Sequence, residues 1–167
     1  MGEASRSQGR QGAVMIVGKD TGELVPVLLV EDDEDDVAIT RRAFKKGRIA
    51  NPLYVTRDGE EAIEFLRRQG RYENADLPQP GLILLDLNMP RLDGREVLKI
   101  IKSDPDLKAI PVVVLTTSSE EADVLHCYED GANTYITKPV DFSNFLSAVV
   151  TLGEYWLCLA QIPGKQG

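Results

Sequence analysis

The amino-acid sequence predicts an α/β fold: a doubly wound, five-stranded parallel sheet with helices on both faces. Short apolar runs alternate along the chain with segments whose apolar residues recur at helical spacing. The runs are apolar almost throughout, which is typical of strands that are buried on both faces. Parallel strands need crossover connections, and these connections are right-handed, so repeated strand and helix units place helices on both sides of one sheet.

Five runs of apolar, β-branched and aromatic residues predict the strands. They cover residues 25–30, 52–56, 82–85, 111–115 and 134–137. Apolar residues three, four or seven positions apart predict the intervening helices. These cover residues 34–46, 60–68, 94–102 and 120–129, and a last helix begins near residue 141. Gly47 and Gly131 end two helices, because glycine readily adopts the conformation that closes a helix. A polar loop with proline covers residues 69–80.

The two ends of the chain are interpreted apart from this core. Residues 1–24 are rich in Gly, Ser, Gln and Arg, so we expect a flexible N-terminal arm or an expression remnant outside the fold. The domain is expected over residues 25–160, followed by a tail at 161–167. Apolar residues at four- and three-residue spacings predict that the last helix extends through Trp156 toward Ile162.

Composition limits the functional classes. A chain of 167 residues favours one domain, and its formal charge of -8 without a basic stripe argues against nucleic-acid binding. Cys127 and Cys158 lack metal-binding or disulfide spacing, so we expect buried thiols in a reducing compartment. The apolar run at residues 13–17 is too short to span a membrane. We expect a soluble, cytoplasmic protein.

Polar residues of complementary chemistry follow four of the expected strands. They are Glu31 and Asp32, then Asp86, then Thr116, and finally Lys138. In a doubly wound sheet, ligands bind outside the carboxyl ends of the strands, where the strand order reverses. The sequence therefore predicts that acids, a hydroxyl and an amine meet at one edge of the sheet.

The residue types indicate phosphoryl chemistry. Crowded carboxylates repel one another unless a hard cation or an ammonium lies among them, and magnesium is the expected cation. Each signal alone has a structural explanation. The acidic run can complement a helix dipole, and Thr116 to Glu120 resembles a helix cap. The combination of all four favours a site at which a carboxylate accepts a phosphoryl group.

With these residues in view, the chain resembles the receiver domain of bacterial two-component response regulators over about residues 25–150. The motifs that carry the resemblance are LLVEDDEDD, LLDLNMPRLDG, VLTTS and GANTYITKP. The resemblance implies a flavodoxin-like fold with strand order 2-1-3-4-5. It also implies a switch rather than a metabolic enzyme, with only self-directed phosphotransfer and autodephosphorylation.

The resemblance assigns roles to single residues. Asp86 matches the phosphoacceptor, Glu31 and Asp32 match the acidic pair that holds magnesium, and Asn88 matches the position that gives the metal a backbone carbonyl. Together with Asp86 they form the expected metal site.

Further positions match the family's response to phosphorylation. Thr116 matches the hydroxyl that hydrogen-bonds the phosphoryl group, and Lys138 matches the lysine that pairs with it. Tyr135 matches the aromatic switch position, and the family's cis peptide would fall at Lys138–Pro139. Thr117 departs from the pattern, because the family usually has a smaller residue there, and it could slow loss of the phosphoryl group.

The resemblance also implies partners. The loop at 69–80 and the extended last helix are similar to small regulators paired with bacterial phytochromes and related sensor histidine kinases. Leu152, Trp156 and Leu159 recur on one helical stripe beyond a minimal receiver, so we expect them to form a dimer or partner surface. A homodimer through the helix at 120–129, strand 134–137 and the last helix is the preferred interpretation, with intramolecular docking as the rival.

Two other functional classes remain. A haloacid-dehalogenase-like phosphatase also uses a strand-end aspartate, but it needs a second carboxylate two residues later, where this chain has Asn88. An interaction module with the same fold predicts an inert Asp86. The complete set of site residues argues against that second class.

Overall fold

A five-stranded parallel sheet forms the centre of the molecule. The computed structural model describes residues 12–18, 21–117, 126–152 and 157–161. The strands of the central sheet are β2 (Val27–Val30), β3 (Leu53–Thr56), β4 (Leu82–Asp86), β5 (Val112–Thr116) and β6 (Thr134–Thr137). Their spatial order is β3-β2-β4-β5-β6, and every pairing is parallel. Without the additional strand β1, this is the predicted order 2-1-3-4-5, which confirms the predicted fold.

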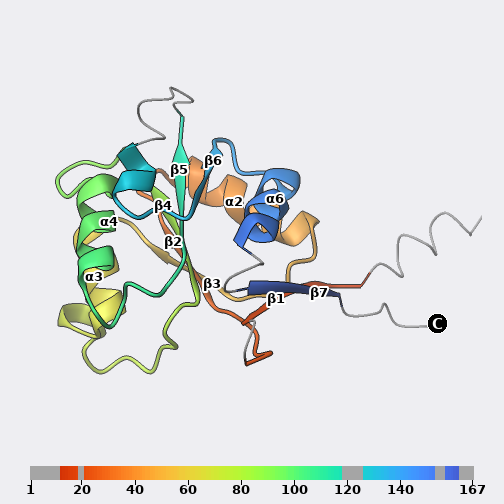
Figure 1. Cartoon of the computed structure of the whole chain (residues 1–167), viewed down its shortest axis with the longest axis horizontal. Coiled ribbons are helices and arrows are strands. Elements are labelled where there is room, and N and C mark those ends of the chain that lie inside the picture. Colours follow the sequence, from red (N-terminus) through yellow and green to blue (C-terminus); the bar gives the residue numbers. More distant parts are fainter. Residues whose placement is uncertain (1–11, 19–20, 118–125, 153–156, 162–167) are drawn as a thin grey trace, which may run out of the picture.

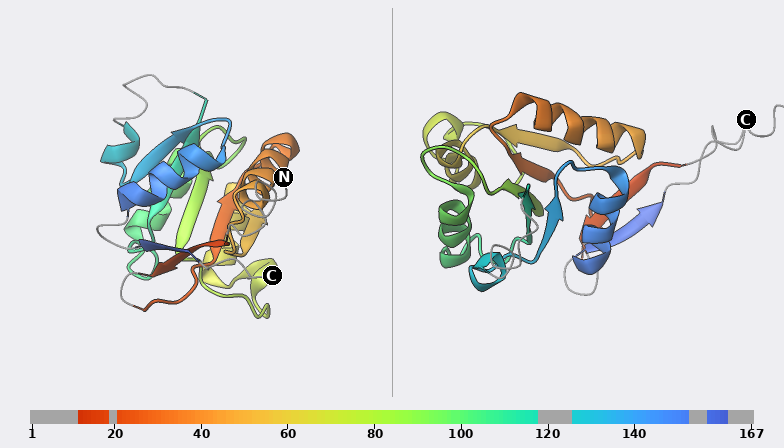
Figure 2. Two further views of the ribbon diagram at one scale, coloured as in Figure 1. Left: turned by 90° about the vertical axis from the view of Figure 1, so that its right-hand side faces the viewer. Right: turned by 90° about the horizontal axis from the view of Figure 1, so that it is seen from above.

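Helices cover both faces of the sheet. Helices α2 (Glu34–Lys46) and α6 (Phe142–Leu152) lie on one face, and α3 (Gly59–Arg67) and α4 (Gly94–Ser103) lie on the other (Figures 1 and 2). Alternate residues of β2, β4 and β5 point to opposite faces and build two separate apolar cores. A 3-10 turn, η1 (Gly70–Tyr72), lies in the loop after α3. In the described part of the chain, no helix has the length and apolar character that crossing a membrane requires.

Aspartate side chains cap three helices at the edge of the sheet where the strands end. The Asp33 carboxylate accepts hydrogen bonds from the backbone N–H groups of Asp35 (2.8 Å) and Asp36 (3.2 Å) at the start of α2. Asp58 and Asp93 cap α3 and α4 in the same way. Such caps satisfy backbone N–H groups that lack a partner within the helix. They therefore fix where each helix begins after its loop.

Part of the segment expected to be a flexible N-terminal arm belongs to the fold, so that prediction was wrong for these residues. Residues 14–18 form strand β1 (Val14–Gly18), which pairs antiparallel with β7 (Leu157–Gln161). The Ile16 side chain is buried, and its backbone exchanges hydrogen bonds with the side chain of Asn51 (2.9 and 2.8 Å). Composition alone suggested an arm, because the strand's partner lies at the other end of the chain. Residues 1–11 lie outside the described residues.

The structure also corrects the expected extension of the last helix. Helix α6 ends at Leu152, and the chain returns as β7 beside β1 rather than continuing as a helix. Leu152 is buried in the core beneath α6, so it does not belong to a partner surface. Leu159 lies in β7 opposite Ile16. Gln161, the first residue of the expected tail, ends β7, whereas Trp156 and residues 162–167 lie outside the described residues.

The helix predicted at 120–129 is described only in part. Residues 126–129 are helical, and residues 118–125 lie outside the described part. Gly131 follows with a φ of +105°, a conformation that favours glycine. The peptide bond between Lys138 and Pro139 is cis, as predicted.

Candidate functional site

Strand β4 carries Asp86 to the carboxyl edge of the sheet. Asp86 continues the alternation of Leu82 and Leu84, so its side chain is directed toward the face that α2 and α6 cover. The residue is almost completely buried. Gly94 packs against the same strand end, since a Cβ atom there would lie 2.2 Å from the Asp86 carbonyl oxygen. A glycine at this position therefore lets the loop from residue 87 to 93 fold back against the aspartate.

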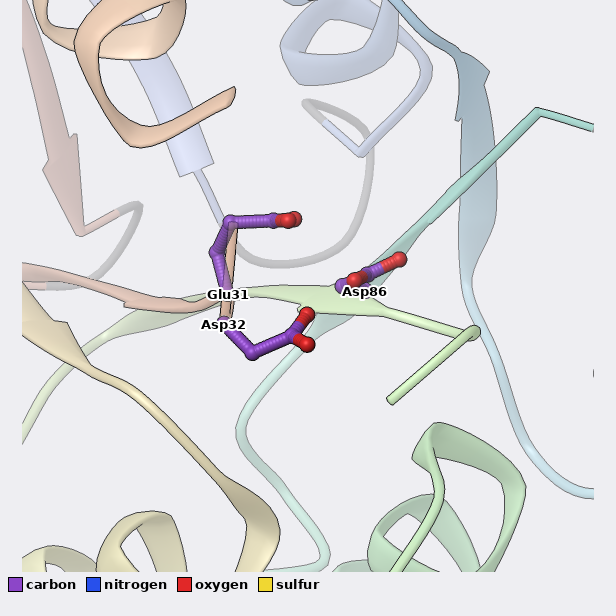
Figure 3. A group of neighbouring side chains, drawn as sticks. All are labelled: Glu31, Asp32 and Asp86. Carbon is purple, nitrogen blue, oxygen red and sulfur yellow. The ribbon is translucent and has the colours of Figure 1, made fainter. Parts of the chain in front are cut away.

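Three carboxylates gather at the ends of β2 and β4 (Figure 3). Glu31 and Asp32 follow β2, and one carboxylate oxygen from each of Glu31, Asp32 and Asp86 lies within 4.8 Å of the others. Glu31 and Asp86 are buried, whereas Asp32 is exposed. The structure thus brings together the three acids that the sequence predicted.

Lys138 lies among these acids. Its Nζ lies 3.0 Å from Asp86 Oδ1 and 3.0 Å from Glu31 Oε2. It also lies 3.0 Å from Oδ2 of Asp36, in the first turn of α2. Lys138 lies in the turn directly after β6. Its backbone N–H donates a hydrogen bond to the Thr116 carbonyl at 2.8 Å. One ammonium therefore faces three carboxylates from different parts of the chain.

The pKa values of the cluster reflect this burial. Burial raises the pKa of Glu31 to about 8, the hydrogen bond from Lys138 opposes the rise, and the Asp86 carboxylate adds to it. Burial likewise raises the pKa of Asp86 above its ordinary value, with Lys138 again opposing. For Lys138, burial lowers the pKa, but hydrogen bonds to the carboxylates outweigh that effect and raise it well above its usual range. The ammonium therefore stays charged, and the carboxylates carry more charge than it compensates.

The donor set fits a hard divalent cation. Lys138 donates a hydrogen bond to Glu31 Oε1 at 3.2 Å, whereas the buried Oε2 accepts none from the described residues although Nζ is near. A buried carboxylate oxygen without a hydrogen-bond donor is costly. Three carboxylates within reach of one point, one of them exposed, are the oxygen ligands that magnesium and manganese take. A cation held there would compensate the negative charge that the Lys138 ammonium does not neutralise.

The remaining predicted residues lie around this cluster. Thr116 is buried at the end of β5, one residue beyond Leu115, which pairs with Asp86. The Asn88 backbone N–H donates to Asp86 Oδ1 at 3.2 Å. Tyr135 lies on β6 with 38% of its surface exposed, and its ring contacts that of Tyr128 edge-on.

Sequence reasoning missed one member of the cluster. Asp36 was interpreted only as part of an acidic run at a helix start. Its position four residues before Thr40 and seven before Ala43 places it on the buried face of α2, because both of those residues are buried. That spacing is the signal that could have identified it.

Comparisons with known proteins agree with this geometry. Residues 27–150 match the response regulator receiver domain family. The chain is 47% identical over 137 residues to response regulator Rcp1 of Synechocystis, covering 82% of this chain and 92% of that protein. It is also similar to the bacteriophytochrome response regulator AtBRR, with 45% identity and a TM-score of 0.73, covering 80% of this chain and 96% of that chain.

Another similar structure is that of the phosphorylated cyanobacterial phytochrome response regulator RcpA. It shares 45% identity with a TM-score of 0.65, covering 79% of this chain and 93% of that chain. The Mn(2+)-bound form of Rcp1 has a TM-score of 0.64 at 46% identity, covering 78% of this chain and 93% of that chain. The family match spans most of the chain, and the acids and lysine of the motifs converge in space. The chain therefore belongs to the response regulator receiver family of two-component signalling.

Proposed function

We propose that Asp86 accepts a phosphoryl group from a phosphohistidine of a sensor histidine kinase. A carboxylate oxygen of Asp86 attacks the phosphorus, an O–P bond forms as the P–N bond breaks, and the imidazole leaves with the electron pair of that bond. The observation that carries the proposal is the Asp86 carboxylate at the edge of the sheet, 3.0 Å from the Lys138 ammonium. A carboxylate held beside a fixed positive charge is suited to nucleophilic attack on a phosphoryl group.

Lys138 and Thr116 are the proposed partners of the phosphoryl group. Phosphoryl transfer depends mainly on positioning and on neutralising charge on the transferred oxygens. The Lys138 ammonium lies beside the attacking carboxylate, and Thr116 ends the neighbouring strand. We expect the ammonium to pair with one phosphoryl oxygen and the threonine hydroxyl to donate to another.

Magnesium is the proposed cation. Glu31, Asp32, Asp86 and the backbone carbonyl of Asn88 would hold it. When bound, it supplies positive charge that stabilises the transferred phosphoryl oxygens. The Mn(2+)-bound structure of the similar protein Rcp1 supports a divalent cation at this type of site.

The proposed output is a change in protein interactions. An aspartyl phosphate adds negative charge where Thr116 and Lys138 can respond, and such a local change can bias a surface between two states. Tyr135, on the strand that leads to Lys138, is the proposed switch residue, and its partly exposed ring supports this role. Slow autodephosphorylation would reset the switch.

The proposed phosphoryl donor is a phytochrome-type histidine kinase in the cytoplasm. AtBRR and RcpA, the similar proteins with solved structures, are described as bacteriophytochrome and cyanobacterial phytochrome response regulators. Their identities of 45% support a donor of the same class here.

A homodimer is proposed through the helix that includes residues 126–129, strand β6 and helix α6. Tyr128, Tyr135 and Val150 are large hydrophobic residues that are exposed, and they come from these three elements. The rings of Tyr128 and Tyr135 contact each other, and contiguous exposed apolar surface often marks an interface. Leu152 is no longer part of this proposal, because it is buried.

Two rival functions are less well supported. The residue two positions after Asp86 is Asn88, whose side chain cannot serve as the general acid of a haloacid-dehalogenase-like phosphatase. If the protein were an interaction module that needs no phosphorylation, the three carboxylates around Lys138 would have no functional explanation.

The test is the intact mass after incubation with magnesium and acetyl phosphate. We expect wild type to gain one phosphoryl group and Asp86→Asn to gain none. Asp76→Asn, a change of the same kind at an exposed loop position, should behave as wild type. A chelator should abolish the gain. Failure of the folded wild-type protein to gain mass would contradict the proposal.

A further inference from the structure

Lys138 has a third carboxylate partner that belongs to neither β2 nor β4. Asp36, in the first turn of α2, accepts a hydrogen bond from Lys138 Nζ at 3.0 Å. Its backbone N–H is held by the Asp33 cap at 3.2 Å, so the start of the helix fixes its position. The neighbouring Asp35 is exposed and has no such contact with Lys138 among the described residues.

The ammonium has no spare donor. A lysine ammonium has three N–H groups and no acceptor. Nζ donates to Glu31 Oε1 at 3.2 Å and to Asp36 Oδ2 at 3.0 Å, and it lies 3.0 Å from Asp86 Oδ1. A phosphoryl group on Asp86 would add strong acceptor oxygens beside the same ammonium. Phosphorylation removes the charge of the Asp86 carboxylate itself, so the phosphoryl oxygens then compete with Glu31 and Asp36 for the N–H groups of Lys138.

Exposure identifies the partner that is easiest to release. The exposed fraction of the side chain is 1% for Glu31 and 2% for Asp86, but 31% for Asp36. A carboxylate left without a partner costs much less free energy where water can solvate it. Asp36 can be solvated at its present position, whereas the buried Glu31, the other carboxylate that remains after phosphorylation, cannot.

We propose that Asp36 is a positioning residue that competes with the phosphoryl group for Lys138. It holds the ammonium in the unphosphorylated protein and releases it when Asp86 carries a phosphoryl group. Asp36 thereby lowers the stability of the phosphorylated state relative to that of the unphosphorylated state. This inference rests on the proposed phosphoacceptor function of Asp86.

The test is the affinity for beryllofluoride, a stable phosphoryl mimic, in the presence of magnesium, measured by calorimetry. We expect Asp36→Asn to bind beryllofluoride about two- to five-fold more tightly than wild type, the range that a partly exposed ion pair allows. Asp35→Asn is the matched control, since it removes the same charge from the same helical turn. Asp36→Glu keeps the carboxylate and should remain near wild type.

A second readout separates competition from a disturbed helix. The magnesium affinity of Asp36→Asn should equal that of Asp35→Asn, because Asp36 is not among the expected metal ligands. A disturbed start of α2 would instead weaken magnesium and beryllofluoride binding together. Asp36→Ser replaces Asp36→Asn if thermal unfolding shows that the asparagine variant is not folded.

The outcomes distinguish this inference from the proposed function. Tighter beryllofluoride binding by Asp36→Asn alone supports competition for Lys138. Equal affinity of Asp36→Asn and Asp35→Asn, or weaker binding by Asp36→Asn, overturns the inference while the phosphoacceptor proposal stands. Wild type that binds no beryllofluoride and gains no phosphoryl mass overturns both.

Discussion

Lys138 and its carboxylate partners dominate the electrostatics of the site. Glu31 and Asp86 are buried, and one ammonium cannot neutralise every negative charge around it. Burial is the main reason why the pKa values of both carboxyl groups are raised, and the Asp86 carboxylate adds to the rise for Glu31. The site in its metal-free form therefore lowers the stability of the fold at neutral pH.

A pH dependence of stability follows from Glu31. Its pKa is raised from 4.5 to about 8 in the folded protein, so between these values the folded state retains a proton that the unfolded state has lost. The stabilisation from the protonated group is complete below the unfolded pKa and is lost as the pH rises through about 8. We expect the free energy of unfolding in chelator to fall from about pH 5 to pH 8.

Denaturant titrations across this pH range measure the effect. Glu31→Gln should reduce the slope of the free energy of unfolding against pH. Glu73→Gln, at an exposed loop position, should leave that slope unchanged. Equal slopes for wild type and Glu31→Gln would contradict the assignment.

Most of the site could be predicted from residue types at strand ends. Asp86, Lys138 and the acidic pair after β2 each follow an apolar run, and the fold rule alone brings such residues together. Asp36 lacks this signal, because it lies within a helix and among five other acidic residues in a run. Its contact with Lys138 depends on how α2 is placed against the sheet.

Gly94 supports Asp86 through close packing rather than through flexibility. A Cβ at this position would lie 2.2 Å from the Asp86 carbonyl oxygen and 2.6 Å from Leu87 Cα, both of them backbone atoms. We expect Gly94→Ala to destabilise the fold by about 1 to 3 kcal/mol, the usual cost of overpacking. It should also reduce the rate of phosphorylation, since the strand end must move. Unchanged stability in denaturant would contradict this close contact.

A buried side-chain amide joins strand β1 to the central domain. The Asn51 side chain exchanges hydrogen bonds with both backbone groups of Ile16 and donates to the Val25 carbonyl at 2.6 Å. Backbone hydrogen bonds between Val14 and the segment at Arg48 and Ala50 reinforce the attachment. The two-stranded β1–β7 sheet is thus attached to the domain through β1.

Asn51→Ala tests this attachment. The change removes three hydrogen bonds and leaves the buried Ile16 N–H and Val25 carbonyl without these partners, whereas the Ile16 carbonyl still accepts from the Val25 N–H. We expect a loss of about 2 to 4 kcal/mol in the free energy of unfolding, together with easier proteolysis in β1. Asn74→Ala, at an exposed loop position, is the control. Resistance of β1 to protease in the Asn51→Ala variant would contradict the role of the amide.

Local patterns predicted the central elements but not the chain ends. Strands buried on both faces are apolar throughout, so β2, β4 and β5 are recognisable without their partners. The segment after Leu152 has apolar residues at helical spacing, yet residues 157–161 form a strand. Its partner β1 lies more than a hundred residues away in sequence, and local spacing carries no information about that pairing.

The phosphoacceptor strand β4 and the proposed interface strand β6 are joined through β5, which pairs with both. Strand β6 presents Tyr135 and leads directly to Lys138, and α6 follows with Val150 exposed at 61%. A change at the site can therefore reach this surface through one short segment.

Val150→Asp tests the proposed dimer. A charge in an apolar interface is costly, whereas the exposed position leaves the fold intact. We expect the dimer to dissociate at protein concentrations where wild type remains dimeric, as measured by sedimentation velocity. Ala38→Asp introduces the same charge at an exposed position on α2 and should have no effect. A wild type that is monomeric with and without beryllofluoride would contradict the dimer.

Asp86 is the residue that we propose carries the phosphoryl group. Borohydride reduces an aspartyl phosphate to homoserine, so peptide mass spectrometry after phosphorylation and reduction identifies the modified residue directly. We predict homoserine at position 86 only, and only when magnesium and a phosphodonor are both present. Homoserine at another aspartate, or none in a protein that has gained phosphoryl mass, would contradict the assignment of Asp86.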